Sequence, residues 1–200
     1  MSSIEELYPV ECAFCKIAQA YPANDPSSSS SPVPHAPDPE KVFPQCQLLL
    51  STPLVLAVLD IMPIAPGHIL LITREHYKKL TDMYPSKAPT LGEWMPILSA
   101  ALCKATGIED WNVVQNNGER AAQVVPHVHF HFIPRYQEGR REVARKGNVD
   151  MGMLRSWKMF GRGAREELDE DEGAELARVL REALREVLGE EMREGGKSKL

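Results

Sequence analysis

Hydrophobic and polar residues alternate strictly over residues 127–133, where the sequence reads HVHFHFI. Successive side chains of a β-strand point to opposite faces, so this alternation predicts a strand with three imidazoles on one face and apolar groups on the other. A solvated edge strand, a metal site and a catalytic histidine are the three interpretations of the pattern. A chemical role is favoured, because half of the chain's six histidines lie here in strict register.

Short apolar runs between residues 47 and 73 predict further strands. The runs LLL, LVLAVLD and ILLIT are rich in Val, Ile and Leu and are separated by Pro and Gly, which is typical of buried strands. Residues 111–115, with the sequence WNVVQ, are expected to form another strand. The middle of the chain is therefore predicted to be a sheet.

Apolar residues recur at three- and four-residue steps in two other segments, which predicts helices. The first covers residues 93–107 and ends at Gly107, a typical C-terminal stop. The second covers about 169–188, with Arg and Glu residues on the face opposite its apolar stripe. We expect this second helix to pack on the domain or on a partner.

Composition bounds the organisation of the chain. With 43% hydrophobic and 26% charged residues, 200 residues suit one soluble core with extensions. We expect a domain over residues 1–140 and a C-terminal extension over 141–200. Residues 21–40 hold six prolines and five consecutive serines, which predicts a disordered insertion.

Charge and hydropathy exclude several kinds of partner. A net charge of −5 gives no general electrostatic attraction to nucleic acid, and no apolar run reaches the length of about 20 residues that a membrane span needs. The N-terminus is acidic and resembles no secretory signal. We therefore expect a cytoplasmic or nuclear protein without a membrane or nucleic-acid partner. In such a reducing compartment the pair Cys12 and Cys15 indicates a metal or redox site rather than a disulfide.

Five motifs in order resemble the histidine triad (HIT) superfamily of nucleotide hydrolases and transferases. The signature His-φ-His-φ-His-φ-φ is met by residues 127–133. The other four are Cys12-x-Phe-Cys15, Asp60-Ile-x-Pro63, Ala65-Pro-Gly-His-Ile-Leu70, and Asn116-x-Gly118 followed by Gln123. The resemblance covers roughly residues 12–135 apart from the Pro/Ser segment, and it is nearer to the Hint branch than to the Fhit branch.

The resemblance implies an α+β fold, in which a five-stranded antiparallel sheet with flanking helices pairs into a two-fold homodimer. It also implies covalent catalysis at the α-phosphate of a nucleotide. His129 would be the nucleophile that forms a nucleotidyl-histidine, His68 would fix its tautomer and His131 would contact the phosphate, with His127 as a further active-site residue. No metal is needed for this chemical step.

The resemblance also assigns ligands. A purine nucleotide of the AMP type would be bound by the two residues Asp60 and Ile61, by His129 and His131, and by the polar loop that contains Asn116, Gly118 and Gln123. Asp60 would accept hydrogen bonds from the ribose hydroxyls. A structural zinc of the Cys₂His₂ type would be held by Cys12, Cys15, His76 and His127. His127 is thus assigned to both sites.

Two departures from the family pattern bear on specificity. Ala122 stands where a glycine is usual, and Val124 stands where the Hint branch has Ser and the Fhit branch has Thr. Asp60 favours a purine nucleoside phosphoramidase, similar to adenosine 5′-monophosphoramidase, because the Fhit branch commonly has Asn there. The alternatives are a diadenosine polyphosphate (Ap3A or Ap4A) hydrolase and, from another class, a non-catalytic nucleotide-binding interaction protein.

Overall fold

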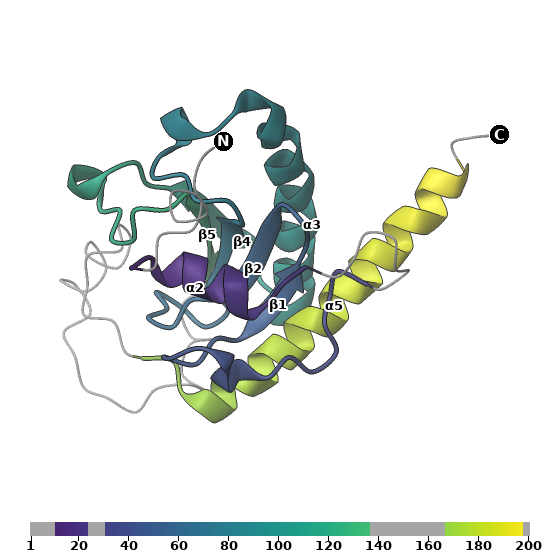
Figure 1. The fold of residues 1–200 in the computed structure, drawn as a ribbon. Coiled ribbons are helices and arrows are strands. Elements are labelled where there is room, and N and C mark those ends of the chain that lie inside the picture. Colours follow the sequence, from purple (N-terminus) through teal and green to yellow (C-terminus); the bar gives the residue numbers. More distant parts are fainter. Residues whose placement is uncertain (1–10, 24–30, 137–166, 198–200) are drawn as a thin grey trace.

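Five strands form one antiparallel sheet in the order β1-β2-β3-β5-β4 (Figure 1). The structure is a computed structural model that describes residues 11–23, 31–136 and 167–197. The predicted sheet is confirmed, and the histidine strand lies inside it, between β3 and β4. The strands are β1 Leu48–Ser51, β2 Val55–Leu59, β3 Ile69–Thr73, β4 Asp110–Gln115 and β5 His129–Arg135.

Three α-helices flank the sheet in the part of the chain that the structure describes: α2 Ala13–Ala20, α3 Ala88–Thr106 and α5 Glu170–Lys197. The predicted helix at 93–107 begins five residues earlier than expected, because Pro89 is accommodated in its first turn. It ends as predicted at Gly107, whose φ of 65° needs the freedom of a glycine. None of the helices within these described ranges is long and apolar enough to cross a membrane.

The sheet separates two hydrophobic clusters. Leu71 of β3 and Phe132 of β5 belong to the cluster that also contains the buried faces of α3 and α5. Leu70 and Ile72, which point to the other face, pack with α2. Figure 1 shows the same arrangement, with α2 on one side of the sheet and α3 and α5 on the other. Because β5 alternates, its histidines lie on the side of α2.

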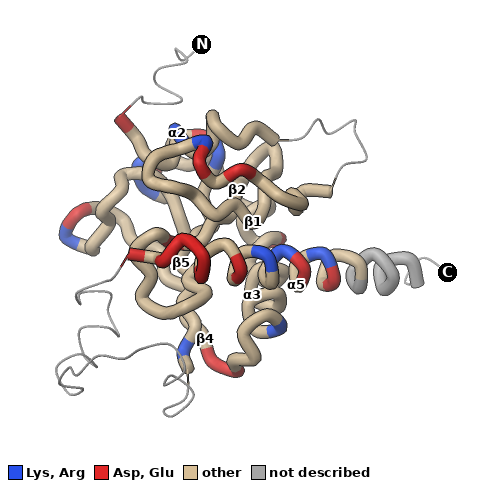
Figure 2. Tube along the Cα trace, turned by 90° about the horizontal axis from the view of Figure 1, so that it is seen from below, with Lys and Arg blue, Asp and Glu red and all other residues tan. Residues whose placement is uncertain are grey.

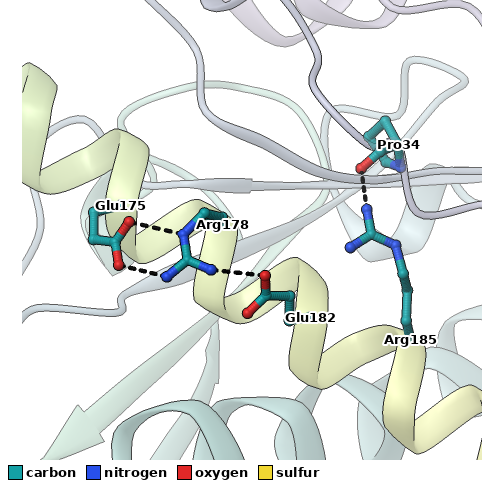
Figure 3. Close-up of polar contacts among 5 residues, drawn as sticks. All are labelled: Pro34, Glu175, Arg178, Glu182 and Arg185. Carbon is teal, nitrogen blue, oxygen red and sulfur yellow. Dashed lines mark hydrogen bonds and ion pairs between the residues drawn. The ribbon is translucent and has the colours of Figure 1, made fainter.

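Helix α5 belongs to the main core. Leu180 and Leu184 have no exposed surface, and both lie in the cluster formed with α3. Arg185 donates a hydrogen bond of 2.8 Å to the carbonyl of Pro34, at the opposite end of the sequence (Figure 3). The helix expected within residues 141–200 therefore packs on the domain, which is one of the two alternatives given for it, and its apolar stripe belongs to the main core.

Acidic and basic residues alternate along α5 (Figure 2), and the side chains of Glu175, Arg178 and Glu182 are exposed. Arg178 donates to Glu175 at 2.6 and 2.8 Å and to Glu182 at 2.7 Å (Figure 3). These exposed ion pairs at three- and four-residue spacing are screened by water and add little to the stability of the helix. The face is solvated, and the apolar stripe determines where the helix lies.

The Pro/Ser-rich segment is partly ordered, which corrects the prediction of a disordered insertion over 21–40. Val33 is buried in the main cluster, and the carbonyl of Pro32 accepts a hydrogen bond of 2.9 Å from the backbone N–H of Ser51. Asp38 caps a short 3₁₀ helix at Pro39–Lys41. Residues 31–40 are therefore anchored by the burial of Val33 and by hydrogen bonds to their backbone carbonyls, among them one of 2.7 Å from the hydroxyl of Tyr21 to Asp38. Residues 24–30, which contain four of the five serines, lie outside the described residues.

Candidate functional site

Strand β5 contains two of the three histidines of the motif, and both lie on the same face of the strand. His129 pairs in register with Ile72 and His131 with Leu70, and their ring centroids are 4.8 Å apart. The strand begins at His129. His127 precedes the strand, so only two of the three predicted imidazoles belong to it. The ring of His127 still lies on the same side of the sheet, because it packs edge-on against Phe14 of α2 with centroids 5.8 Å apart.

The ring of His129 has a defined tautomer. Its Nδ1 lies 2.6 Å from the carbonyl oxygen of His127, and a carbonyl can only accept, so Nδ1 carries the proton. The lone pair is therefore on Nε2. His129 is 4% exposed, and burial lowers its pKa, which favours the neutral ring. The ring is also packed edge-on against Phe14 of α2, with centroids 4.9 Å apart.

His68 is part of a chain of polar side chains that ends at His131. Oδ2 of Asp60 lies 3.2 Å from Nδ1 of His68, and Nε2 of His68 lies 3.0 Å from Nδ1 of His131. The prediction that His68 fixes the tautomer of His129 is therefore wrong, since the carbonyl of His127 does so. Asp60 and His131 approach opposite nitrogens of one buried ring, so these two contacts cannot converge on a single cation.

The second cluster of ligand-type side chains joins α2 to the segment that follows β3 and to the segment that precedes β5. Sγ of Cys12 lies 3.3 Å from Nδ1 of His127, and Sγ of Cys15 lies 3.3 Å from Nδ1 of His76. The two Nδ1 atoms are 3.2 Å apart. Metal bonds of about 2.3 Å to sulfur and 2.0–2.1 Å to nitrogen place tetrahedral ligand atoms about 3.3–3.8 Å apart. The four predicted metal ligands therefore fit a tetrahedral ion.

Protonation in this cluster suits a metal at Cys12 and at His76. The hydrogen bond with the Cys15 thiol, followed by the one with His127, holds the pKa of Cys12 far below its ordinary value, whereas the same hydrogen bond raises the pKa of Cys15. Burial lowers the pKa of His76, and neutral imidazole is the form that binds a metal. Nε2 of His127 donates to the carbonyl of Thr73 at 2.8 Å, which leaves its Nδ1 as the ligand atom.

His127 was assigned both to the metal site and to the active site, and different parts of the residue face each: the side chain faces the metal ligands and the main chain faces the active site. Its imidazole is fully buried, with Nδ1 facing the cysteines and Nε2 bonded to Thr73. Its carbonyl holds the ring of His129. The predicted direct part of the His127 side chain in catalysis does not match this orientation, because both ring nitrogens face protein groups.

The loop before β5 is held by Gln123. The side-chain oxygen of Gln123 accepts from the backbone N–H of Gly118 at 2.6 Å, and its amide nitrogen donates to the carbonyl of Lys78 at 2.7 Å. Gln123 is therefore a positioning residue, whereas a direct contact with the nucleotide was expected. Ala122 has φ 62°, a left-handed conformation that costs a non-glycine residue about 1–2 kcal/mol. That strain explains why a glycine is expected at this position.

A groove of about 1860 Å³ contains the polar residues that remain available to a ligand. His129 and His131 line it together with Asp60, Ile61 and Asn116, all of which are among the residues expected to bind the nucleotide. His68 and Gln123 are buried behind this surface. The backbone N–H of Gly118 donates to the side chain of Gln123 and so helps to hold the loop before β5. The groove therefore combines a buried imidazole, a carboxylate and amide groups with apolar surface.

Sequence reasoning missed part of the groove. Phe43 is 99% exposed in it, and Met62 and Val124 are its other exposed apolar residues besides Ile61. Phe43 lies in the Pro-rich approach to β1, and no periodicity there marks an aromatic residue as a surface group. An exposed aromatic ring beside a polar site is a typical contact for a flat apolar ligand.

Arg74 is a second residue that the sequence did not single out. It is 9% exposed, and its guanidinium donates to the carbonyls of Thr52, Ala18 and Tyr21 at 2.7–3.1 Å and to the hydroxyl of Ser51 at 2.7 Å. Because these groups belong to the C-terminal end of α2 and to the end of β1 with the residue after it, Arg74 fixes α2 on the sheet. Its position directly after a buried strand was the only sequence signal.

Comparison with known proteins places the chain in a family. The family model described as "HIT domain" matches residues 44–138. The chain is 34% identical over 125 residues to "Adenylylsulfatase HINT3" of Arabidopsis thaliana, covering 62% of this chain and 52% of that protein. It is 42% identical over 93 residues to "Adenosine 5'-monophosphoramidase hnt1" of Schizosaccharomyces pombe, covering 46% of this chain and 67% of that protein.

The fold agrees with this result. A solved structure described as a Zn-bound histidine triad family protein from Mycobacterium smegmatis superposes with a TM-score of 0.59 at 22% identity, covering 90% of this chain and 96% of that one. The chain thus spans about half of the Arabidopsis relative and nearly all of this structural neighbour. Together with the five motifs, these matches show that the chain belongs to the histidine triad (HIT) family, on its Hint-like branch.

Proposed function

We propose that the protein is a nucleotide hydrolase in which His129 attacks the α-phosphorus of a bound nucleotide. The observation that carries the proposal is the 2.6 Å hydrogen bond from Nδ1 of His129 to the carbonyl of His127. It places the lone pair on Nε2, in a ring that lines the groove. An imidazole held in this tautomer is ready to act as a nucleophile without a separate base.

The reaction would have two displacements. Nε2 of His129 forms a bond to the α-phosphorus as the bond from phosphorus to the leaving group breaks. The resulting nucleotidyl-imidazolium keeps its proton on Nδ1, where the carbonyl of His127 stabilises the positive charge. Water then attacks phosphorus, the P–N bond to His129 breaks, and a nucleoside monophosphate is released.

The other groove residues would bind the substrate around this nitrogen. Oδ1 of Asp60 accepts from the backbone N–H of Met62 at 2.9 Å, which orients the carboxylate, and carboxylate oxygens accept hydrogen bonds of the kind that ribose hydroxyls donate. His131, backed by His68, would contact the phosphate. Asn116 would add a polar contact beside it.

We propose purine nucleoside phosphoramidates as the substrate class. Asp60 at the ribose position supports it, as does the name of the S. pombe relative, an adenosine 5′-monophosphoramidase. The size of the groove favours a second candidate, dinucleoside polyphosphates. At about 1860 Å³ it exceeds the roughly 300–1000 Å³ typical of small-molecule pockets and has room for a second nucleoside.

We also propose a structural zinc at Cys12, Cys15, His76 and His127. The distances among these ligand atoms, given above, support it. The ion would join α2 to the residue whose carbonyl orients His129. Four protein ligands close the coordination sphere, so the ion itself would not bind substrate.

A homodimer is proposed through the edge strand β4. This strand lies at one end of the sheet, and Trp111 and Val113 on it are 38% and 43% exposed. An edge strand with exposed apolar residues is suited to pair with a second copy of itself across a two-fold axis.

The test compares wild-type protein with His129→Ala on adenosine 5′-phosphoramidate and on diadenosine triphosphate, with AMP release measured by chromatography. Loss of a nucleophile typically lowers kcat by about 10³-fold or more. A covalent adduct of one nucleotidyl group, seen by mass spectrometry after an alkaline quench in wild type and not in the variant, is the second expected result.

The relative rates on the two substrates decide between the substrate classes. Turnover of neither substrate above the level of His129→Ala would overturn the hydrolase proposal. If AMP still bound under those conditions, the result would support the non-catalytic nucleotide-binding protein instead.

A further inference from the structure

We propose that the start of α5 positions the nucleotide-binding loop, through Leu168 and Gly173. The loop in question is residues 60–64, which include Asp60 and Ile61. For nucleotide binding the inference rests on the function proposed above. The mechanical coupling of the two segments stands on the structure of the free protein.

The first observation is a direct hydrogen bond between the two segments. The backbone N–H of Leu168 donates to the carbonyl of Ile61 at 2.9 Å. Ile61 follows Asp60 and is itself part of the groove surface, with 37% of its surface exposed. A residue 107 positions later in the sequence therefore holds the main chain next to the proposed ribose carboxylate.

The second observation is that Leu168 is itself fixed by its neighbours. Asp169 caps α5, with Oδ1 accepting from the N–H groups of Asp171 and Glu172 at 3.0 Å, and its carbonyl accepts from Gly173 at 2.8 Å. The side chain of Leu168 packs against the bare backbone of Gly173. A Cβ on Gly173 would lie 2.9 Å from Cδ2 of Leu168, closer than real Cβ contacts come, and 3.1 Å from its Cγ, which is an unusually tight contact.

The third observation is that α5 is a rigid support. Leu180 and Leu184 are completely buried in the main core, and Arg181 donates to the carbonyl of Leu48 in β1 at 2.9 Å. The loop is thus tied to a helix that packs on the opposite face of the sheet from the histidines. Within the loop, the hydrogen bond from Met62 to Asp60 transmits the position of the main chain to the carboxylate.

The test uses Gly173→Ala, with Gly189→Ala as the matched control. Both substitutions add the same methyl group to α5 and the same gain in helix propensity, but a Cβ on Gly189 would meet nothing within 4 Å. Only Gly173→Ala must displace Leu168. A double variant, Gly173→Ala with Leu168→Ala, removes the clash while keeping the backbone N–H and should reverse the effect.

Two measurements are made on each protein. Hydrogen–deuterium exchange of the amides of residues 60–64 in the free protein should be faster in Gly173→Ala and unchanged in Gly189→Ala. The Kd for AMP, measured by calorimetry, should rise about 3- to 10-fold in Gly173→Ala, which corresponds to the loss of one net hydrogen bond. The double variant should return both values towards wild type.

Unchanged exchange of residues 60–64 in Gly173→Ala would overturn the coupling, as would equal effects of the two glycine variants or a failure of the double variant to restore exchange. Faster exchange together with an unchanged Kd would show that the loop does not contribute to nucleotide binding and would overturn its positioning role. Absence of AMP binding to the wild type would instead contradict the proposed function, while the exchange result would still decide the coupling.

Discussion

Helix α5 should contribute a large part of the stability of the domain, and Leu184→Ala tests this. Leu184 has no exposed surface and lies in the cluster that contains α3 and the inner face of the sheet. A helix that packed on a partner instead of on the domain, the other alternative given for this segment, would make the same substitution nearly neutral.

The expected loss follows from the burial of this side chain. Leu184→Ala removes three carbon atoms, worth about 0.8 kcal/mol each, or about 2.4 kcal/mol of transfer free energy. The cavity left behind adds to this, so the free energy of unfolding should fall by about 2.5–5 kcal/mol. That is a large fraction of the roughly 5–15 kcal/mol by which a domain is usually stable.

The assay is urea unfolding at 25 °C, followed by tryptophan fluorescence; Trp94, one of the chain's three tryptophans, is 9% exposed in the same cluster. With an m-value of about 2 kcal/mol/M, the midpoint should fall by more than about 1 M. Glu182→Ala, half a turn away on the solvated face, should change the free energy of unfolding by less than about 0.5 kcal/mol. A loss below about 1 kcal/mol for Leu184→Ala would refute the reasoning.

Four other predictions concern the sites. Protein purified without added zinc should contain about one equivalent of the metal, and Cys12→Ser should lower this content and the Tm, because metal binding is coupled to folding; full occupancy in the variant would contradict the proposed ligand set. Val113→Lys should give a monomer in sedimentation velocity, because a lysine on an edge strand opposes pairing. Phe43→Ala should raise KM several-fold with an unchanged unfolding curve, since the ring is 99% exposed and lines the groove. Arg74→Ala should lower the free energy of unfolding by about 3 kcal/mol or more in urea titrations, since it leaves several buried acceptors unpaired.

The strands and helices were predictable where the pattern of apolar residues was strong within a short stretch of sequence. The runs that became β2 and β3 are apolar throughout, as expected of strands covered on both faces, and both are completely buried. The stripe of α5 was visible for the same reason. Its location was not, because an amphipathic face indicates that something covers it without indicating what.

The sequence indicated which residues would lie near one another in the site, but it indicated less well which atoms of these residues would be in contact. The motif identified His68 and His131, and the structure brings them within 3.0 Å of each other. The error over which group fixes His129 arose because a main-chain carbonyl has no sequence signature. The same limitation applies to Arg74, whose partners are mainly backbone oxygens.

His127 explains why a metal outside the groove matters for the proposed chemistry. Its imidazole contributes a nitrogen to the Cys₂His₂ cluster, and its carbonyl, a few bonds away, sets the tautomer of His129. A displacement of that ring would move the carbonyl and weaken the hydrogen bond that keeps the lone pair on Nε2. Cys12 and Cys15 would then influence catalysis through the position of one oxygen atom, although neither residue contacts the substrate. Substitution of a zinc ligand is therefore expected to impair both metal binding and the activity of His129, and to lower kcat more than it changes KM.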